Sequence, residues 1–159
     1  MNTPSVTRLT ESDWRAFAEL RLQALYDSLG PRDAQYLQES SFTAAQWRRR
    51  LRAHAQFAAL VDDRPVGLIG AQREHADSVY LYSLWLQPGE RGRGIGQNLV
   101  TAAVDWARAQ RVRTVTLRVN AANAAARGVY EALGFRLAPV VGDENISPTD
   151  ELTMSLNVG

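Results

Sequence analysis

Apolar side chains in the first third of the chain recur every three or four residues, which is typical of amphipathic helices. A capping-box pattern at residues 10–13 precedes the first such stretch, and Gly30-Pro31 interrupts it. We expect this first helix to bury five large apolar side chains, namely Trp14, Phe17, Leu22, Leu25 and Leu29. The segment 32–41 is polar and unpatterned, so it predicts a loop with a short helical turn.

A second capping box is formed by Thr43 and Gln46, and Phe42 can staple to Trp47 across the start of the helix that follows. This helix is expected to end near residue 53. Beyond it the period changes to short apolar runs bounded by turn residues, which is typical of strands. The pattern predicts strands at 6–9, 57–61, 66–71, 79–86, 114–119, 135–137 and 152–156.

Two further helices lie between the later strands. The first follows a glycine-rich turn and places apolar side chains on one face, namely Ile95, Leu99, Ala103 and Trp106. The second spans 121–133, with Asn120 as its expected N-cap and Gly134 as its left-handed C-terminal residue. Residues 139–150 are expected to form a loop.

The strand-helix-strand unit from 79 to 119 requires a right-handed crossover if its two strands share a sheet, which makes that pair parallel. The hairpins on either side of it are antiparallel. The pattern therefore predicts an α/β protein of the α+β type, in which helices cover a mixed and mostly antiparallel sheet.

The chain has 159 residues, a length that favours one domain over residues 1–159. Its formal net charge of +1 argues against a protein that tracks nucleic-acid phosphates. It contains no Cys, which excludes disulfides and thiolate catalysis, and all 18 basic residues are Arg. The absence of Lys excludes the Walker P-loop and Schiff-base enzymes. No signal peptide or membrane span is seen, so a cytoplasmic protein is expected.

The glycine-rich turn at residues 91–96 (Arg-Gly-Arg-Gly-Ile-Gly) lies between a strand and a helix. Glycines bring backbone N–H groups close to a ligand, and the start of the next helix adds free amides and the positive end of its dipole. Arg91 and Arg93 add charge that suits phosphate. The Rossmann fingerprint fails at Gln97, and a turn that needs glycine for geometry alone is the remaining alternative.

These residues resemble the Arg/Gln-x-x-Gly-x-Gly/Ala motif of the GCN5-related N-acetyltransferases, the GNAT family. Residues 123–135 (Asn-Ala-Ala-Ala-Arg-Gly-Val-Tyr-Glu-Ala-Leu-Gly-Phe) resemble that family's Asn-x-x-Ala-x-x-Leu-Tyr-x-x-x-Gly-Phe signature, with Val129 in place of Leu. Residues 20–28 are similar to the first helix of bacterial members. The resemblance covers essentially the whole chain, and it implies a sheet of about six or seven strands, about four helices and one splayed parallel pair.

The resemblance implies that acetyl-CoA lies between the splayed strands. Backbone amides near the end of the first strand of that pair would bind pantetheine and the acetyl carbonyl, while those of the glycine turn would hold the pyrophosphate. The residues implied in cofactor binding are Leu84, Trp85, Leu86, Arg91, Gly92, Arg93, Gly94, Ile95, Gly96, Gln97, Asn123 and Tyr130. Asn123 has the alternative of a cap-region residue. Tyr130 matches the family's general acid, because a phenol with a reference pKa of about 10 is protonated at neutral pH.

A general base is less clear from the sequence. Candidates near the strand at 79–86 are Glu74, His75, Asp77, Tyr80 and Tyr82, each of which has a purely structural alternative. His54 and His75 form no metal-ligand pattern, so no metal is expected. The helices before residue 53 and the loop 139–150 would wall the acceptor site, and Asp143-Glu144 weakly favour a cationic acceptor.

The expected function is transfer of the acetyl group of acetyl-CoA to a primary amine by direct attack in a ternary complex. The acceptor is a small molecule or a protein N-terminus, with no nucleic-acid or membrane partner. A homodimer is expected from the resemblance alone. A CoA-binding sensor without turnover is the main alternative, and an interaction domain that binds another phosphate ligand is a second.

Overall fold

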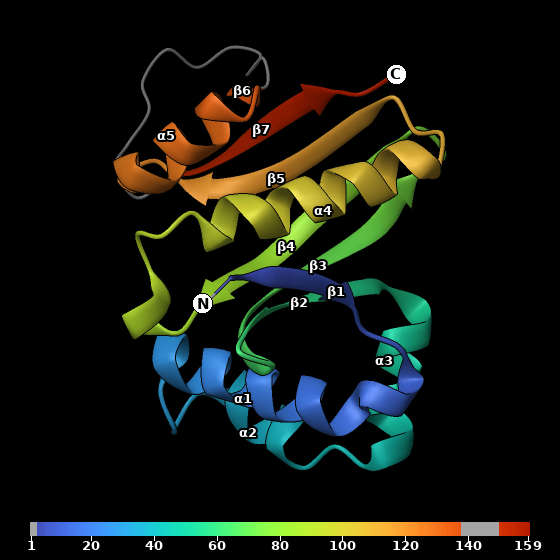
Figure 1. The fold of residues 1–159 in the computed structure, drawn as a ribbon, viewed down its shortest axis with the longest axis vertical. Helices are drawn as coiled ribbons and strands as arrows, with labels where there is room; N and C mark the ends of the chain where they lie inside the picture. The colour runs from blue at the N-terminus through green and yellow to red at the C-terminus, as the bar shows by residue number, and fades with distance from the viewer. Residues whose placement is uncertain (1–2, 138–149) are drawn as a thin grey trace.

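A single sheet of seven strands runs through the computed structural model, which describes residues 3–137 and 150–159 (Figure 1). The strands are β1 Ser5–Arg8, β2 Ala55–Val61, β3 Arg64–His75, β4 Ser78–Leu86, β5 Thr114–Asn120, β6 Arg136–Leu137 and β7 Glu151–Asn157. Their order across the sheet is β1-β2-β3-β4-β5-β7-β6, and every pair is antiparallel except β4 with β5. The predicted mixed and mostly antiparallel sheet with one parallel pair is therefore confirmed.

Helices cover both faces of this sheet. They are α1 Trp14–Leu29, α2 Ala34–Ser40, α3 Ala44–Ala53, α4 Ile95–Ala109 and α5 Ala124–Ala132, with short 3-10 turns at η1 Glu11–Asp13 and η2 Pro88–Glu90. One apolar core lies between the sheet and α4 with α5, and a second lies between the sheet and α1 with α3. Figure 1 shows α1, α2 and α3 gathered together, away from α5 at the other end of the molecule.

The segment 32–41, predicted as a loop with a short helical turn, contains the two-turn helix α2. Asp33 caps it, because its carboxylate accepts hydrogen bonds from the backbone N–H groups of Gln35 and Tyr36 at 2.8 and 3.2 Å. The helix is longer than the predicted turn, and the sequence did not show its length because it has no apolar face to the core: its one buried side chain is Glu39.

The first helix buries a different set of residues from the one expected. Leu29 is 49% exposed, and Trp14 and Leu22 are only partly buried. The core side of α1 consists of Phe17, Ala18, Leu20, Ala24 and Leu25. Phe17 and Leu25 are thus buried as expected, whereas Ala18, Leu20 and Ala24 take the place of Trp14, Leu22 and Leu29 in the core. The second capping box is confirmed, and the Phe42 and Trp47 rings lie 5.1 Å apart.

The parallel pair separates soon after it begins. Hydrogen-bonded register joins β4 and β5 only from Ser78 opposite Thr114 to Tyr80 opposite Thr116. Beyond Tyr80, the backbone groups of β4 that would face β5 have no strand partner. The splayed pair expected from the resemblance is therefore present, and it leaves an open edge within the sheet.

A β-bulge at Ser83 lies in the middle of this open segment. Tyr82 pairs with Gly70 and Trp85 pairs with Leu68, so three steps along β4 match two along β3, and Ser83 has a φ of +57°. Such a bulge shifts the alternation of side chains between the two faces. Leu84 consequently packs against the α4 core, whereas Tyr82 faces the other side of the sheet.

The predicted N-cap of the last helix is wrong by three residues. Asn123, not Asn120, caps α5 by accepting a hydrogen bond from the backbone N–H of Ala126 at 3.1 Å. Asn120 instead accepts from the N–H of Ala122 at 2.9 Å. Gly134, with a φ of +100°, takes the predicted left-handed position after the helix. The expected loop at 139–150, with Asp143 and Glu144, lies outside the described residues except for its last residue.

Candidate functional site

A cavity of about 640 Å³ opens where the end of β4, the glycine turn and α5 meet. Its lining residues are Leu84, Trp85, Leu86, Arg91, Gly92, Gly94, Gly96, Gln97, Asn123, Ala125, Ala126, Val129 and Tyr130. Every residue that the resemblance implied in cofactor binding is among them, except Arg93 and Ile95. Two motifs far apart in the sequence therefore form one site because β4 and β5 splay.

The glycine turn supplies the polar end of this cavity. Gly92 and Gly94 have φ values of +79° and +80°, a region that glycine adopts without strain. Gly94 is the N-cap of α4, so the backbone N–H groups at the start of that helix have no acceptor within it. These amides and the helix dipole make the site suitable for an anion.

The two arginines of the turn are held by acidic partners. Arg91 pairs with Asp27 at 3.0 Å and also donates to the backbone carbonyl of Leu86 at 3.1 Å, while it still lines the cavity. Arg93 pairs with Glu90 at 2.5 Å and does not line it. Ile95 is fully buried in the α4 core, so only its backbone is available near the turn. The anion site thus depends more on backbone amides than the sequence suggested.

Asp27 was not recognised from the sequence as part of this site. Its carboxylate accepts from the Trp85 indole N–H at 2.9 Å as well as from Arg91, and these two hydrogen bonds, Trp85 first, lower its pKa. It thereby ties α1 to the end of β4 and to the glycine turn. The only signal was its place in the helix segment 20–28 that resembles the family.

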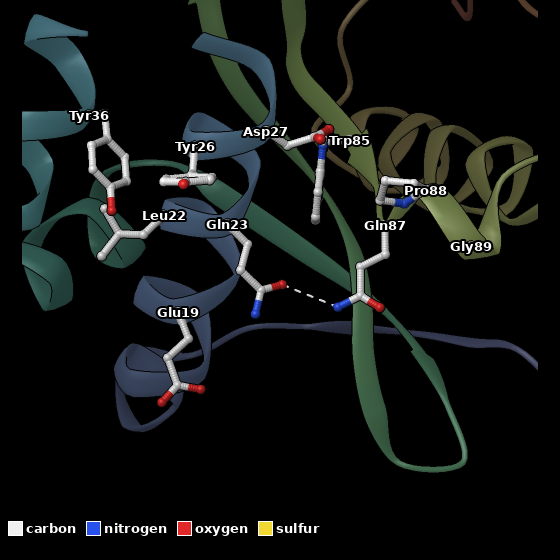
Figure 2. Close-up of a pocket in the computed structure, with 10 residues that line it drawn as sticks. All are labelled: Glu19, Leu22, Gln23, Tyr26, Asp27, Tyr36, Trp85, Gln87, Pro88 and Gly89. Atoms are coloured by element: carbon white, nitrogen blue, oxygen red, sulfur yellow. Dashed lines mark hydrogen bonds between the residues drawn. The ribbon is translucent and has the colours of Figure 1, made fainter. Parts of the chain in front are cut away.

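A separate groove of about 620 Å³ is lined by residues of α1, α2, β4 and η2, including Trp85 (Figure 2). Figure 2 shows the side chains of α1 facing those of β4 and η2, with Gln23 and Gln87 joined by a hydrogen bond of 3.2 Å. Trp85 lines both this groove and the cavity above, so its indole forms part of the wall between them.

Tyr130 lies in the last turn of α5 and is 8% exposed. Burial raises the pKa of its phenol above the ordinary value, and the hydroxyl makes no hydrogen bond to a described residue. The side chain lines both the main cavity and a smaller one of about 210 Å³ within the splay, next to Tyr82, Ser83 and Leu84. It is thus a protonated donor at the junction of the two cavities.

The candidate bases from the sequence divide into two groups. Glu74, His75 and Asp77 lie at the turn between β3 and β4, at the opposite end of β4 from Leu86. Nine residues of strand separate the two ends by roughly 25 Å, so the structure does not bring these three to the cavity. Tyr82, in contrast, lines the cavity in the splay, and Tyr80 stacks on it at 6.1 Å.

A cavity of about 290 Å³ lies on the α1 and α3 side of the splay. Its wall holds Arg21 and Arg50, which both contact the buried carboxylate of Glu39, at 3.1 and 2.6 Å. Gln35 also donates to Glu39 at 3.0 Å. Burial raises the pKa of Glu39, but the hydrogen bonds and charges of the arginines outweigh it, and the pKa is lowered.

The same cavity contains a hydrogen-bonded cluster that the sequence did not reveal. The Tyr82 hydroxyl lies 2.6 Å from His54 Nδ1 and 2.7 Å from Gln56 Nε2. The available signal was weak: Gln56 is a polar residue at the start of an otherwise apolar strand, and His54 directly precedes that strand.

Among the described residues, no three His, Asp or Glu side chains gather as a metal site requires. None of the described helices has the length and apolar character of a membrane span.

Comparison with known proteins finds a matching family and several similar sequences. The sequence model of the Acetyltransferase (GNAT) family matches residues 14–135. An uncharacterized N-acetyltransferase of Methanocaldococcus jannaschii is 26% identical over 149 residues, which cover 89% of this chain and 64% of that protein. An L-methionine sulfoximine/L-methionine sulfone acetyltransferase of Pseudomonas aeruginosa is 31% identical over 80 residues, which cover 48% of this chain and 46% of that one.

The fold recurs in solved structures. The PaiA N-acetyltransferase of Thermoplasma acidophilum, solved in complex with coenzyme A, superposes with a TM-score of 0.72 at 15% identity, over 98% of this chain and 99% of that one. At this identity the likeness concerns the fold. The chain spans less than two thirds of the length of the two curated relatives above.

Proposed function

Since the chain belongs to the acetyltransferase (GNAT) family, we propose that it transfers the acetyl group of acetyl-CoA to a primary amine by direct attack in a ternary complex. The observation that carries the proposal is the cavity that joins the first amides of α4 to Tyr130 along the open edge of β4. It offers an anion site at one end and a proton donor at the other, with an apolar channel between them.

The residues present fit acetyl-CoA. The amides around Gly94 and Gly96 would hold its pyrophosphate, and Arg91 would contribute charge at the same end. Beyond Tyr80 the edge of β4 has no strand partner, so its N–H and C=O groups are free to pair with the pantetheine amides. An N–H near Leu84 would polarise the acetyl carbonyl, as an oxyanion hole does.

Tyr130 would complete the reaction at the sulfur. When the amine nitrogen bonds to the carbonyl carbon and the carbon–sulfur bond breaks, the phenol gives its proton to the departing thiolate. Its raised pKa keeps the proton on the phenol until that moment. This role also separates the proposal from a CoA-binding sensor, because a sensor has no use for a proton donor at the thioester.

Titration with acetyl-CoA and with CoA, followed by thiol release with a panel of amines, tests the proposal. The panel contains L-methionine sulfone, a polyamine and a peptide with N-terminal alanine. The protein has no Cys, so every thiol detected comes from CoA. Binding with thiol release confirms the transferase. Binding without release on any amine favours the sensor, and no binding of either ligand contradicts the site.

We further propose that the acceptor is a small amine or a protein N-terminus, in a cytoplasmic protein without a nucleic-acid partner. A homodimer would cover the exposed apolar side chains of α1 and α2, namely Tyr26, Leu29 and Leu37. Light scattering that gives a mass near 17.6 kDa at all micromolar concentrations would contradict the dimer.

A further inference from the structure

We propose that His54, acting through the hydroxyl of Tyr82, accepts the proton of the acceptor amine on the α1 and α3 side of the splayed strands. The inference rests on the proposed function and deepens it, because the amine can attack only after it has lost a proton. It assigns the base to a pair of residues from different elements, the C-cap of α3 and the middle of β4.

The hydrogen bonds around Tyr82 fix the direction of proton movement. A phenol oxygen has one proton to donate and two positions that accept. Gln56 Nε2 donates to one accepting position at 2.7 Å, and in the His54 tautomer that carries its proton on Nε2, Tyr82 donates its own proton to His54 Nδ1 at 2.6 Å. One accepting position is left on the Tyr82 oxygen for the N–H of an amine in the cavity.

The surroundings keep His54 neutral and therefore able to accept a proton. Burial first, and then the charge of Arg50 on the same helix, lower its pKa below 6.5. Arg21 from α1 also lines the cavity, and both arginines pair with the buried carboxylate of Glu39 from α2, which does not line it. Two positive charges against one negative charge disfavour a third positive charge on the imidazole.

Tyr82 lines cavities on both sides of the opening between β4 and β5. Together with Ser83, it lines both the cavity of about 290 Å³ on the α1 and α3 side and the cavity of about 210 Å³ in the splay. Tyr130 lines the second of these. Tyr130, the proposed proton donor, and Tyr82 therefore line the same cavity in the splay. The bulge at Ser83 creates this arrangement, because it turns Tyr82 and Leu84 to opposite faces of the sheet.

His54 also provides an exit for the proton. It lines a hollow of about 270 Å³ on the outer side of α3, beside Phe42 and Gln46. Because the Tyr82 proton goes to Nδ1, the neutral ring carries its own proton on Nε2. After Nδ1 accepts the incoming proton, Nε2 can release one to water in that hollow.

The protons balance over the whole reaction. The ammonium group gives one proton to the Tyr82 oxygen while Tyr82 gives its own to His54. The neutral amine then forms the C–N bond, the C–S bond breaks, and the thiolate takes the proton of Tyr130. The second nitrogen proton restores Tyr130, so the products are an amide, a thiol and one proton released through His54.

The decisive measurement is the pH dependence of kcat/KM for His54→Gln, with the best acceptor from the amine panel as the probe. Without the base the amine must arrive already neutral, so kcat/KM should rise about tenfold per pH unit up to the pKa of the amine itself. We expect a loss of about 100-fold at pH 7 and recovery at high pH. Tyr82→Phe should show the same profile, and added imidazole should partly rescue His54→Ala.

The matched control is His75→Gln, which changes the other histidine of the chain, 76% exposed at the turn between β3 and β4. It should keep the wild-type profile, and it leaves His54 as the single histidine in NMR titration. Acetyl-CoA affinity should be unchanged in every variant, which verifies folding. If kcat/KM of His54→Gln falls toward low pH in the same way as that of the wild type, or if His54 titrates above 6.5, the relay is wrong. The proposed acetyl transfer would not be affected by either result. A wild-type protein that binds acetyl-CoA but acetylates no amine overturns the proposed function.

Discussion

The two sides of the splayed strand pair are built in opposite ways. The side that faces α4 and α5 presents backbone amides and small residues, drawn from two continuous stretches of sequence. The side that faces α1 and α3 presents charged and polar side chains, contributed one or two at a time by five different elements, from Arg21 to Tyr82. One side depends on the path of the backbone, and the other on a network of side chains.

This difference predicts how each side responds to substitution. Where backbone amides bind, a side chain can change without effect unless the new residue cannot adopt the required φ or fills the space. Where side chains bind one another, removal of one leaves its partners buried without compensation. Tyr130 is the exception on the α5 side, because the proton transfer proposed there depends on a side chain.

The largest effect is expected at that exception. Tyr130→Phe removes one hydroxyl and keeps the ring that packs against Phe135 at 6.1 Å. General-acid catalysis contributes about 10²–10⁴-fold, and we expect a fall in kcat near the lower end, because a CoA thiolate is already a tolerable leaving group. Acetyl-CoA affinity should not change, since protonation of the thiolate belongs to the transition state. Steady-state kinetics with an acetyl-CoA titration measure both.

Two results would contradict this role for Tyr130. Full kcat in Tyr130→Phe, with chemistry shown to limit the rate, would exclude it as the acid. Weaker acetyl-CoA binding with kcat unchanged would make the hydroxyl a cofactor contact. In that case the α4 and α5 side would consist of binding groups throughout, and the contrast with the other side would become sharper.

The same contrast explains what the sequence could reveal. The glycine turn and the segment 123–135 could be identified because each is continuous and its spacing follows from local backbone geometry. The network of Glu39, Arg21 and Arg50 could not, because α2 has no apolar period and its members are brought together only by tertiary packing. The bulge at Ser83 was also missed, because the sequence of a mostly apolar strand does not show which residue is left unpaired with the neighbouring strand.

The largest loss of stability is expected on the α1 and α3 side. Glu39→Gln removes the buried charge that Arg21 and Arg50 share, and loss of one member of a buried ion pair costs about 3–5 kcal/mol. We expect about 3 kcal/mol, because Arg50 is 31% exposed and partly solvated. Denaturant unfolding measures the change. Glu11→Gln is the control, since its pair with Arg52 lies on the surface and should be worth at most about 1 kcal/mol.

The pH dependence of this loss has a defined sign. The pKa of Glu39 is lowered in the folded protein from 4.5, so its ionised form stabilises the fold above that pH. The stabilisation disappears as the pH falls through the folded value. The difference in unfolding free energy between wild type and Glu39→Gln should therefore shrink below about pH 4.5. A difference that stays constant to low pH would show that packing, not charge, holds the network.

A smaller effect, on binding, is expected at the glycine turn. Gly94→Asp places a carboxylate near the proposed pyrophosphate site, at a φ of +80° that other residues rarely adopt. Acetyl-CoA affinity should fall at least about tenfold, or 1.4 kcal/mol, while the protein still folds. Gly89→Asp is the control, because it adds the same charge in η2, at an ordinary φ and with open space around the new Cβ. Unchanged binding in a folded Gly94→Asp protein would contradict the site.

The smallest effect concerns Asn123, where the two functions of one side chain can be separated. Its amide oxygen caps α5 by accepting from Ala126 at 3.1 Å, and the residue also lines the main cavity. Serine is an equally good N-cap, so Asn123→Ser should change the unfolding free energy by no more than a few tenths of a kcal/mol, whereas Asn123→Ala should cost about 1 kcal/mol. The serine variant keeps the cap but loses the amide NH₂. If acetyl-CoA affinity falls severalfold in Asn123→Ser without loss of stability, the amide contacts the cofactor, and a side chain contributes to a surface that otherwise binds through its backbone. If affinity is unchanged in Asn123→Ser and falls only in Asn123→Ala, Asn123 acts by holding the start of α5 in place, and the α4 and α5 side binds its ligand through backbone geometry alone.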